Sequence, residues 1–164
     1  MMRALVTGNF EGQTPVNNIH GTLVDLVGGG VLLRGPSGMG KSDLALRLMD
    51  RGAVLVADDQ VILDARRRGL VGSAPDSLYG LIEVRGIGIM SLPAIKTALV
   101  KLVVDLTDAD SVERLPEKAF VELEGVSLPC LRLHAFDVST PQKIELAIRY
   151  PDQLGLGVED YKKG

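Results

Sequence analysis

The sequence predicts an α/β domain built on a mixed, twisted sheet with flanking helices. Two observations support this class. A glycine-rich run at residues 35–42 lies between an apolar stretch typical of strands and a stretch with helical spacing. A second apolar run, at residues 53–57, ends in two aspartates and has the composition of a strand buried on both faces. A strand, a glycine-rich loop and a helix, followed by another buried strand, indicate a P-loop domain.

The individual elements follow from the apolar pattern along the chain. Val24–Leu33 is apolar but interrupted by Gly28–Gly30, so we expect two short strands joined by a tight turn. Apolar residues at 44, 45, 48 and 49 predict a helix from Ser42 to Arg51 that ends at Gly52. We expect further strands at 61–64, 80–85, 99–106, 119–123 and 128–134, and helices at 93–98 and 140–149.

Length and composition predict one globular domain over residues 1–164, with a poorly ordered polar tail at 153–164. The 164 residues are 46% apolar and 24% charged, with a formal charge of -3. This mildly acidic balance argues against nucleic acid or an anionic membrane as a partner, and we read the basic run Arg66–Arg68 as a solvated loop. Because Met1–Asn9 lacks an apolar core and no apolar stretch reaches about 20 residues, we expect a cytoplasmic protein. The single Cys130 is expected to act as a small buried hydrophobe.

The glycine-rich run fits the phosphate-loop pattern G-x-x-x-x-G-K-[ST]. Its glycines allow successive backbone N–H groups to face phosphate oxygens, and the helix that follows adds its positive dipole end. We expect Lys41 to lie along the β and γ phosphates of ATP and the Ser42 hydroxyl to ligate Mg²⁺. A turn that only connects a strand and a helix is the structural alternative. The predicted nucleotide-binding residues are Gly35, Pro36, Ser37, Gly38, Met39, Gly40, Lys41 and Ser42.

Asp58 and Asp59 form a pair of carboxylates at the end of the predicted strand. Burying two like charges together is costly unless a metal or a proton gives them separate roles. Since alternate strand residues point to opposite sides, one aspartate is expected to face the phosphates and the other to address the metal or brace the site. The sequence leaves open which aspartate takes which role. A turn after the strand would also explain the pair.

Four elements in a fixed order resemble the catalytic domain of the bacterial HPr kinase/phosphorylase family. They are His20-Gly21, the phosphate loop, the run Leu55-Val-Ala-Asp-Asp59, and the run Leu81-Ile-Glu-Val-Arg-Gly-Ile-Gly-Ile-Met90. The family has the order H-G, G-x-x-G-x-G-K-S, A-D-D and E-[IV]-R-G-[LI]-G-I. The match covers about residues 20–91 and implies a P-loop kinase fold of the HPr kinase/PEP carboxykinase-like type.

This resemblance implies an ATP- and Mg²⁺-dependent serine kinase that phosphorylates the phosphocarrier protein HPr of the sugar phosphotransferase system. It also implies phosphorolysis of seryl-phosphorylated HPr, with inorganic phosphate or pyrophosphate as further ligands, and a homo-oligomer, a hexamer in the family. Asp59 lies at the spacing of the family's proton acceptor. The catalytic matches are His20, Lys41, Asp58, Asp59 and Arg114; the magnesium ligands are Ser42 and Glu83; and the substrate signature contributes Arg85, Gly86 and Gly88.

Glu83 and Arg85 are two residues apart on a predicted strand, so an ordinary surface contact between them is the alternative to a functional role. Gly86 and Gly88 bracket Ile87 and would weaken a regular strand, which suggests close approach of another backbone or of a partner. We therefore expect the protein substrate to dock here.

The sequence departs from the family in two places. Longer members carry an N-terminal domain, whereas about twenty residues precede His20 here, so we expect regulation through that domain to be missing. The family segment P-V-R-P-G-R-N, linked to dephosphorylation and subunit contacts, corresponds to Val138–Lys143, where only Pro141 and Lys143 match. Phosphorolysis and the hexamer are thus less supported than kinase activity. Two other functions stay open: a P-loop kinase with a different protein or small-molecule acceptor, and a non-catalytic nucleotide-sensing module.

Overall fold

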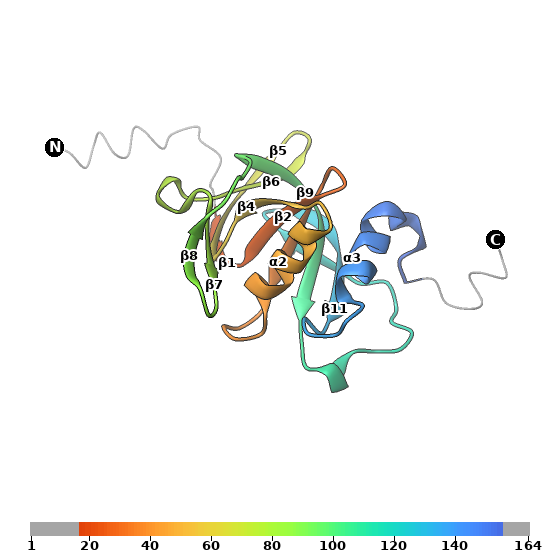
Figure 1. The fold of residues 1–164 in the computed structure, drawn as a ribbon. Helices are drawn as coiled ribbons and strands as arrows, with labels where there is room; N and C mark the ends of the chain where they lie inside the picture. The colour runs from red at the N-terminus through yellow and green to blue at the C-terminus, as the bar shows by residue number, and fades with distance from the viewer. Residues whose placement is uncertain (1–16, 156–164) are drawn as a thin grey trace.

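A computed structural model describes residues 17–155, in which strands form a mixed sheet and two helices pack on it (Figure 1). Within these residues, nine strands build one sheet with the central order β1-β5-β6-β9-β3-β2-β4; β11 pairs with β9, and β10 pairs with β11. A separate two-stranded hairpin is formed by β7 and β8. The fold therefore confirms the predicted α/β class. The strands are β1 (Asn17–His20), β2 (Thr22–Leu26), β3 (Gly29–Arg34), β4 (Val54–Ala57), β5 (Gln60–Arg66), β6 (Gly69–Ser73), β7 (Leu81–Val84), β8 (Gly88–Ser91), β9 (Thr97–Leu106), β10 (Phe120–Leu123) and β11 (Val126–Leu133), and the helices are α2 (Lys41–Asp50) and α3 (Thr140–Arg149), with 3-10 turns η1 (Asp76–Leu78), η2 (Ala109–Ser111) and η3 (Pro151–Gln153).

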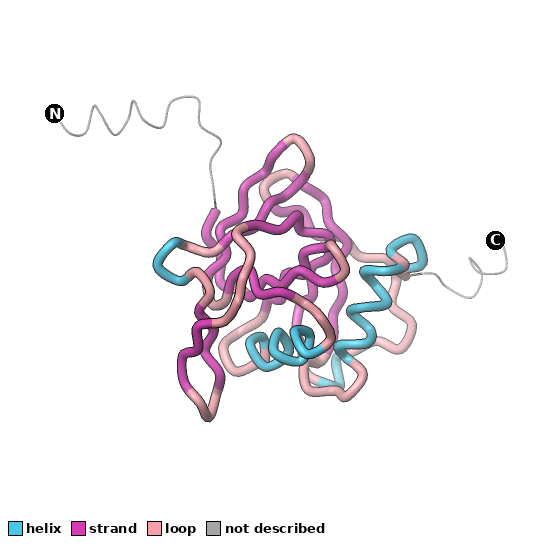
Figure 2. Tube along the Cα trace, turned by 45° about the horizontal axis from the view of Figure 1, so that its top comes forward, coloured by secondary structure: helices cyan, strands magenta, loops and turns pink. Residues whose placement is uncertain are grey.

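Both faces of the sheet carry an apolar core. Consecutive residues of β3 alternate between the two faces, so that Leu33 packs in the cluster that contains Leu44 and Ile144 of the helices, and Leu32 packs in the opposite cluster. Figure 2 shows both helices on the same side of the curved strands. The two-sided burial explains why β3, β4 and the second half of β9 read as nearly continuous apolar runs.

The topology brings four loops to one edge of the sheet. Strands β3, β9 and β11 run parallel to one another, and β4 has the direction of β3 because both are antiparallel to β2. The loops that follow these strands thus leave from the same end, which lies at the bottom of Figure 1. In open α/β sheets, ligands bind at the carboxyl ends of the strands.

Several predicted elements are confirmed, and one is wrong. The hairpin of β2 and β3, the helix after the phosphate loop, β4 and α3 lie where the pattern placed them. The helix predicted at 93–98 does not form. Pro93 precedes a parallel bridge between Ala94 and Leu55, Ile95 donates its N–H to the Leu55 carbonyl, and β9 begins at Thr97. Tertiary pairing along β4 thus decided the conformation of this short segment.

The terminal predictions fall mainly outside the described residues. This applies to the Met1–Asn9 segment and to most of the predicted tail, since the description ends at Gly155, shortly after η3. Among the described residues, no helix has the length and apolar character needed to span a membrane.

Candidate active site

The phosphate loop connects β3 to α2 and ends at Gly40, where any residue other than glycine would be strained. Gly40 has a φ of 93°, in the left-handed region, and its carbonyl accepts the N–H of Leu44 at 2.8 Å to start the helix. A Cβ atom at this position would lie 2.7 Å from Cζ of Phe136 and 2.8 Å from Cβ of Ala135. The loop is therefore packed directly against the segment that follows β11.

Lys41 closes the phosphate loop on itself. Its side chain is buried, and Nζ donates to the carbonyl of Gly35 at 2.6 Å and to that of Pro36 at 3.1 Å. Burial lowers the pKa of Lys41 from its ordinary value, while the negative charges of Asp58 and Asp59 oppose this change. An ammonium group held this way can exchange two neutral carbonyl acceptors for phosphate oxygens, which would favour its charged form.

Asp58 is a buried carboxylate that joins three elements. Its Oδ1 accepts hydrogen bonds from the Thr22 hydroxyl of β2 and the Ser42 hydroxyl of α2, each at 2.9 Å, and its Oδ2 accepts the backbone N–H of Glu83 at 3.1 Å. The residue is only 6% exposed. Three donors compensate for the burial of its charge, so the Ser42 hydroxyl is fixed at the first turn of α2.

Asp59 points the other way, to the mouth of the cleft. Its φ of 70° is left-handed, an uncommon conformation for a residue other than glycine, and its backbone carbonyl accepts the N–H of Gly21. The side chain is 65% exposed, and its Oδ1 lies 3.4 Å from Nδ1 of His20. The pair of aspartates thus separates into one buried and one accessible carboxylate.

These groups line one cleft of about 410 Å³ at the carboxyl edge of the sheet. The structure brings together ten of the residues singled out from the sequence: His20, Ser37, Gly38, Gly40, Lys41, Ser42, Asp58, Asp59, Glu83 and Arg85. The cleft is also lined by Asp43, Leu46, Val84 and Phe136, which the sequence analysis did not identify. Three loop residues do not line it: Gly35 and Pro36 supply the carbonyls that bind Lys41, and Met39 packs against the apolar core.

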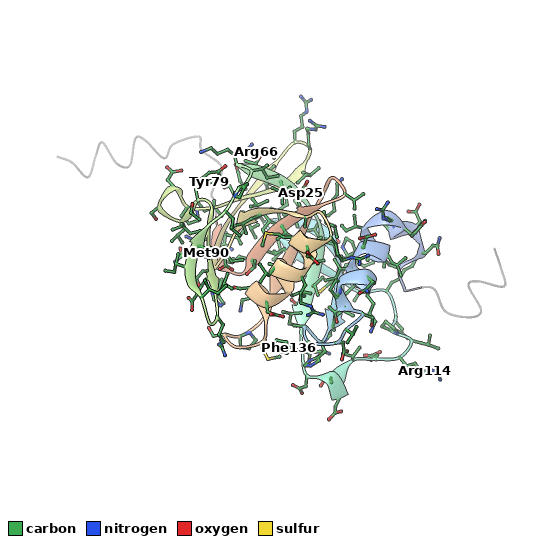
Figure 3. The ribbon with its side chains drawn as sticks, viewed as in Figure 1. Asp25, Arg66, Tyr79, Met90, Arg114 and Phe136 are labelled. Atoms are coloured by element: carbon green, nitrogen blue, oxygen red, sulfur yellow. The ribbon has the colours of Figure 1, made fainter. Side chains whose placement is uncertain are left out.

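Arg114 is not brought to this cleft. It is exposed on the segment after η2, where it lines a second, larger cavity of about 920 Å³ between residues 111–120 and the region of η3. Figure 3 shows Arg114 at the outer edge of the molecule, away from Phe136 at the cleft. The larger cavity contains none of the phosphate-loop residues, so its size does not make it the better site for phosphate chemistry. A catalytic role for Arg114 stays a prediction.

The signature around Glu83 has a different geometry from the one expected. Gly86 lies in the turn of the β7–β8 hairpin and Gly88 is the first residue of β8; their φ values are 92° and 111°, and no atom lies within 4 Å of a Cβ built on either. Their conformation, and not close approach of another backbone in the described chain, explains the two glycines. Among the ion pairs of residues 17–155, none joins Glu83 to Arg85. Docking of a partner at this hairpin stays a prediction.

The oxygen ligands in the cleft suit a magnesium ion carried by a nucleotide. The described residues contain no cluster of three His, Cys, Asp or Glu side chains that could hold a metal alone. They do provide the Ser42 hydroxyl beside the buried Asp58 carboxylate, with Glu83 lining the same cleft. Mg²⁺ is commonly bound by one or two carboxylates together with substrate phosphates, and this ligand set matches that mode.

Comparisons with known proteins identify the family to which the chain belongs. The family model of the HPr serine kinase C-terminal domain matches residues 12–149. The chain belongs to this family. Among its relatives, the HPr kinase/phosphorylase of Variovorax paradoxus is 41% identical over 122 residues, which are 70% of this chain and 37% of that protein. The HPr kinase/phosphorylase of Clostridium acetobutylicum is 49% identical over 81 residues, 49% of this chain and 27% of the relative.

A solved structure shows the same fold. The HPr(Ser) kinase/phosphatase from Coxiella burnetii superposes with a TM-score of 0.73 at 27% sequence identity, over 83% of this chain and 96% of that one. The predicted family and the P-loop kinase type of fold are thus confirmed. The chain spans only 37% of the length of the HPr kinase/phosphorylase from Variovorax paradoxus.

Proposed function

We propose that this HPr serine kinase domain is an ATP- and Mg²⁺-dependent protein kinase that phosphorylates a serine of HPr. The proposal rests on the different environments of the two aspartates. Asp58 is buried and holds the Ser42 hydroxyl at the phosphate loop, whereas Asp59 is exposed at the mouth of the same cleft beside His20. A large substrate such as a folded protein can reach Asp59 but not Asp58.

The residues have distinct roles in the proposed transfer. Phosphoryl transfer depends on positioning and on neutralising the charge of the transferring group, with little covalent participation by the protein. When bound, Mg²⁺ would neutralise charge on the phosphate oxygens, and Ser42, Asp58 and Glu83 are the residues that would hold it. Lys41 would turn from the loop carbonyls to the phosphates.

Asp59 is the proposed proton acceptor. One of its oxygens lies near His20, and the exposed carboxylate is free to accept the proton of a serine hydroxyl as the serine oxygen bonds to phosphorus and ADP leaves. His20 orients this carboxylate from the end of β1. In the reverse direction a phosphate oxygen would attack the seryl phosphorus, pyrophosphate would form, and Asp59 would return the proton to the serine oxygen.

The relatives support HPr as the acceptor by their names, HPr kinase/phosphorylase, but the chain corresponds to only part of their length. We further propose that residues 1–164 act as one catalytic domain in the cytoplasm, assembled as a homo-oligomer. A P-loop kinase with another acceptor is the second candidate, because Val138–Lys143 differs from the family segment linked to dephosphorylation.

Transfer of labelled phosphate tests the proposal. The protein is incubated with HPr of its own organism, Mg²⁺ and labelled ATP, and afterwards with inorganic phosphate alone. We expect label on HPr, a loss of about 100-fold or more in rate for Asp59→Asn, and an unchanged rate for Asp76→Asn, an exposed aspartate of η1. A second incubation uses a cell extract in place of purified HPr. Label on another component of the extract, with none on HPr, would identify the second candidate instead.

A further inference from the structure

Phe136 is a half-exposed aromatic residue on the rim of the cleft. It lies between β11 and α3, is 54% exposed, and is the only residue of the loop 134–139 that lines the cleft. Among the residues that line the cleft, Phe136 is the one phenylalanine, and none is a tyrosine or a tryptophan. Neither the proposed proton transfer nor the magnesium ligands involve Phe136.

The loop that carries Phe136 is held firmly. Arg47 of α2 donates from its guanidinium to the carbonyl of Ala135 and, at 2.7 Å, to that of Asp137. The Thr140 hydroxyl donates to the carbonyl of His134 at 2.5 Å. These bonds anchor the loop to α2 and α3 on either side of the ring.

The ring itself has fixed neighbours. Phe136 meets the His134 ring edge-to-face, with centroids 5.7 Å apart at 72°, and His134 Nδ1 lies 2.9 Å from the Thr107 carbonyl after β9. The ring also lies against the phosphate loop at Gly40. An aromatic ring is thus held at the end of the phosphate loop, where it lines the cleft and about half of the residue's surface stays exposed; Figure 3 labels its position.

The order of the strands indicates how a bound nucleotide would be oriented along the edge of the sheet. The phosphate loop follows β3, the carboxylate pair follows β4 on one side of it, and Phe136 follows β11 on the other side, beyond β9. The transferring phosphate must lie at the carboxylates, since Asp58 holds Ser42 there. For a nucleotide lying along this edge of the sheet, the nucleoside end would then extend in the opposite direction, towards the loops after β9 and β11.

We propose that Phe136 stacks against the nucleobase of the bound nucleotide, in a position fixed by Arg47. This inference rests on the proposed function and adds a base subsite to it. Every base presents a π-face, so stacking on an aromatic ring contributes affinity with little discrimination between bases. Because Phe136 is the only side chain of its loop in the cleft, ATP and GTP are expected to bind within a few-fold of each other.

Fluorescence provides a direct test, because the chain contains no tryptophan. Phe136→Trp places a single tryptophan at the proposed base subsite. Phe120→Trp is the matched control, since Phe120 is 64% exposed and lines the other cavity. We expect Mg-ATP and Mg-GTP to quench the tryptophan at 136, Mg-tripolyphosphate to leave it unchanged, and none of the three to affect the tryptophan at 120.

Calorimetry separates stacking from a structural role. Phe136→Ala is expected to weaken the binding of Mg-ATP about 10-fold or more and to change the binding of Mg-tripolyphosphate less than about twofold. Equal losses for both ligands would show that Phe136 only supports the phosphate loop, and an unchanged affinity for ATP would also overturn the inference. A changed KM for HPr with unchanged ATP affinity would assign Phe136 to protein docking instead. If the wild-type protein binds neither ligand, both the inference and the proposed function fail; if it binds ATP no better than tripolyphosphate, only the inference fails.

Discussion

Asp58→Asn and Asp58→Ala are expected to separate the structural contribution of this residue from that of its charge. In the folded protein, Asp58 accepts hydrogen bonds from two hydroxyls and one backbone N–H while only 6% exposed. Alanine removes all three acceptor contacts. Asparagine can keep all three, because its oxygen can accept the Glu83 N–H and its NH₂ group can donate to the oxygens of the Thr22 and Ser42 hydroxyls.

The expected magnitudes follow from this count. For Asp58→Ala, the fully buried Thr22 hydroxyl loses its partner, and bonds to a carboxylate are lost as well, so the free energy of unfolding should fall by about 3–5 kcal/mol. For Asp58→Asn only the charge assistance is lost, and relief from burying a carboxylate offsets part of it, which leaves a cost of about 1 kcal/mol. Both variants remove a proposed magnesium ligand and should lose phosphate transfer.

Urea titration of the full chain, followed by circular dichroism, measures these differences. At about 2 kcal/mol per molar urea, a gap of about 2–4 kcal/mol separates the two unfolding midpoints by roughly 1–2 M. If Asp58→Ala were as stable as Asp58→Asn, the three hydrogen bonds would not hold the site together, and the reasoning would fail.

Three further predictions address the phosphate loop and the Cys130 thiol. This thiol is only partly buried and donates to the Asp105 carboxylate at 3.4 Å, so the expectation that Cys130 acts as a small buried hydrophobe was wrong. Gly40→Ala is expected to destabilise the fold by about 2–4 kcal/mol in the same urea assay, because the left-handed backbone is strained and the new Cβ meets the Phe136 ring. Gly38→Ala is the control: its Cβ would meet no atom within 4 Å, so it should cost only about 1 kcal/mol. Equal losses of stability in the two variants would refute the packing argument. Because burial lowers the pKa of Lys41, its ammonium group loses its proton at a lower pH than an ordinary lysine does. The affinity for tripolyphosphate, measured by calorimetry, should therefore fall as the pH rises from about 8 to about 10, and Lys41→Arg should show no such fall. The same pH dependence in both proteins would contradict the role of Lys41 in phosphate binding. Burial and the Asp105 carboxylate raise the pKa of Cys130 from 9.0 to about 11, so at pH 8 its alkylation by iodoacetamide should be about 100-fold slower in the folded protein than in urea, and a difference below tenfold would speak against this environment.

The chemistry of the site could be predicted from the sequence where it depends on local runs of residues. The phosphate loop and the aspartates at the end of β4 each lie within a short segment whose residue types and flanking periodicity indicate their structure. The expectation that Asp58 and Asp59 point in different directions is met, although both residues lie after the end of β4 and strand alternation is not the cause. Which aspartate is buried could not be predicted, because the left-handed φ of Asp59 and the contacts of Asp58 with Thr22 and Glu83 arise only on folding.

The features that could not be predicted from the sequence depend on contacts between segments that are distant along the chain. Phe136 meets Gly40 only because the parallel strands β3, β9 and β11 end at one edge, and nothing around Phe136 in the sequence signals this. Strand β6 contains two glycines and so gives a weak strand signal, yet Gly72 has a reason to be there, because a Cβ would overlap the Cδ2 methyl of Leu23 and force that buried side chain to shift. The segment 93–98 shows the reverse case: it was predicted to be a helix, but Ala94 and Ile95 pair with Leu55 of β4 and β9 begins at Thr97.

Calorimetric titration of the wild-type protein with Mg-ATP tests most directly whether the phosphate loop and the buried aspartate form one nucleotide site. We predict saturable binding that requires magnesium, with one nucleotide per chain, and a loss of binding in Lys41→Met and in Ser42→Ala. Absence of binding in the wild type, or equal affinity in the wild type and both variants, would contradict the account.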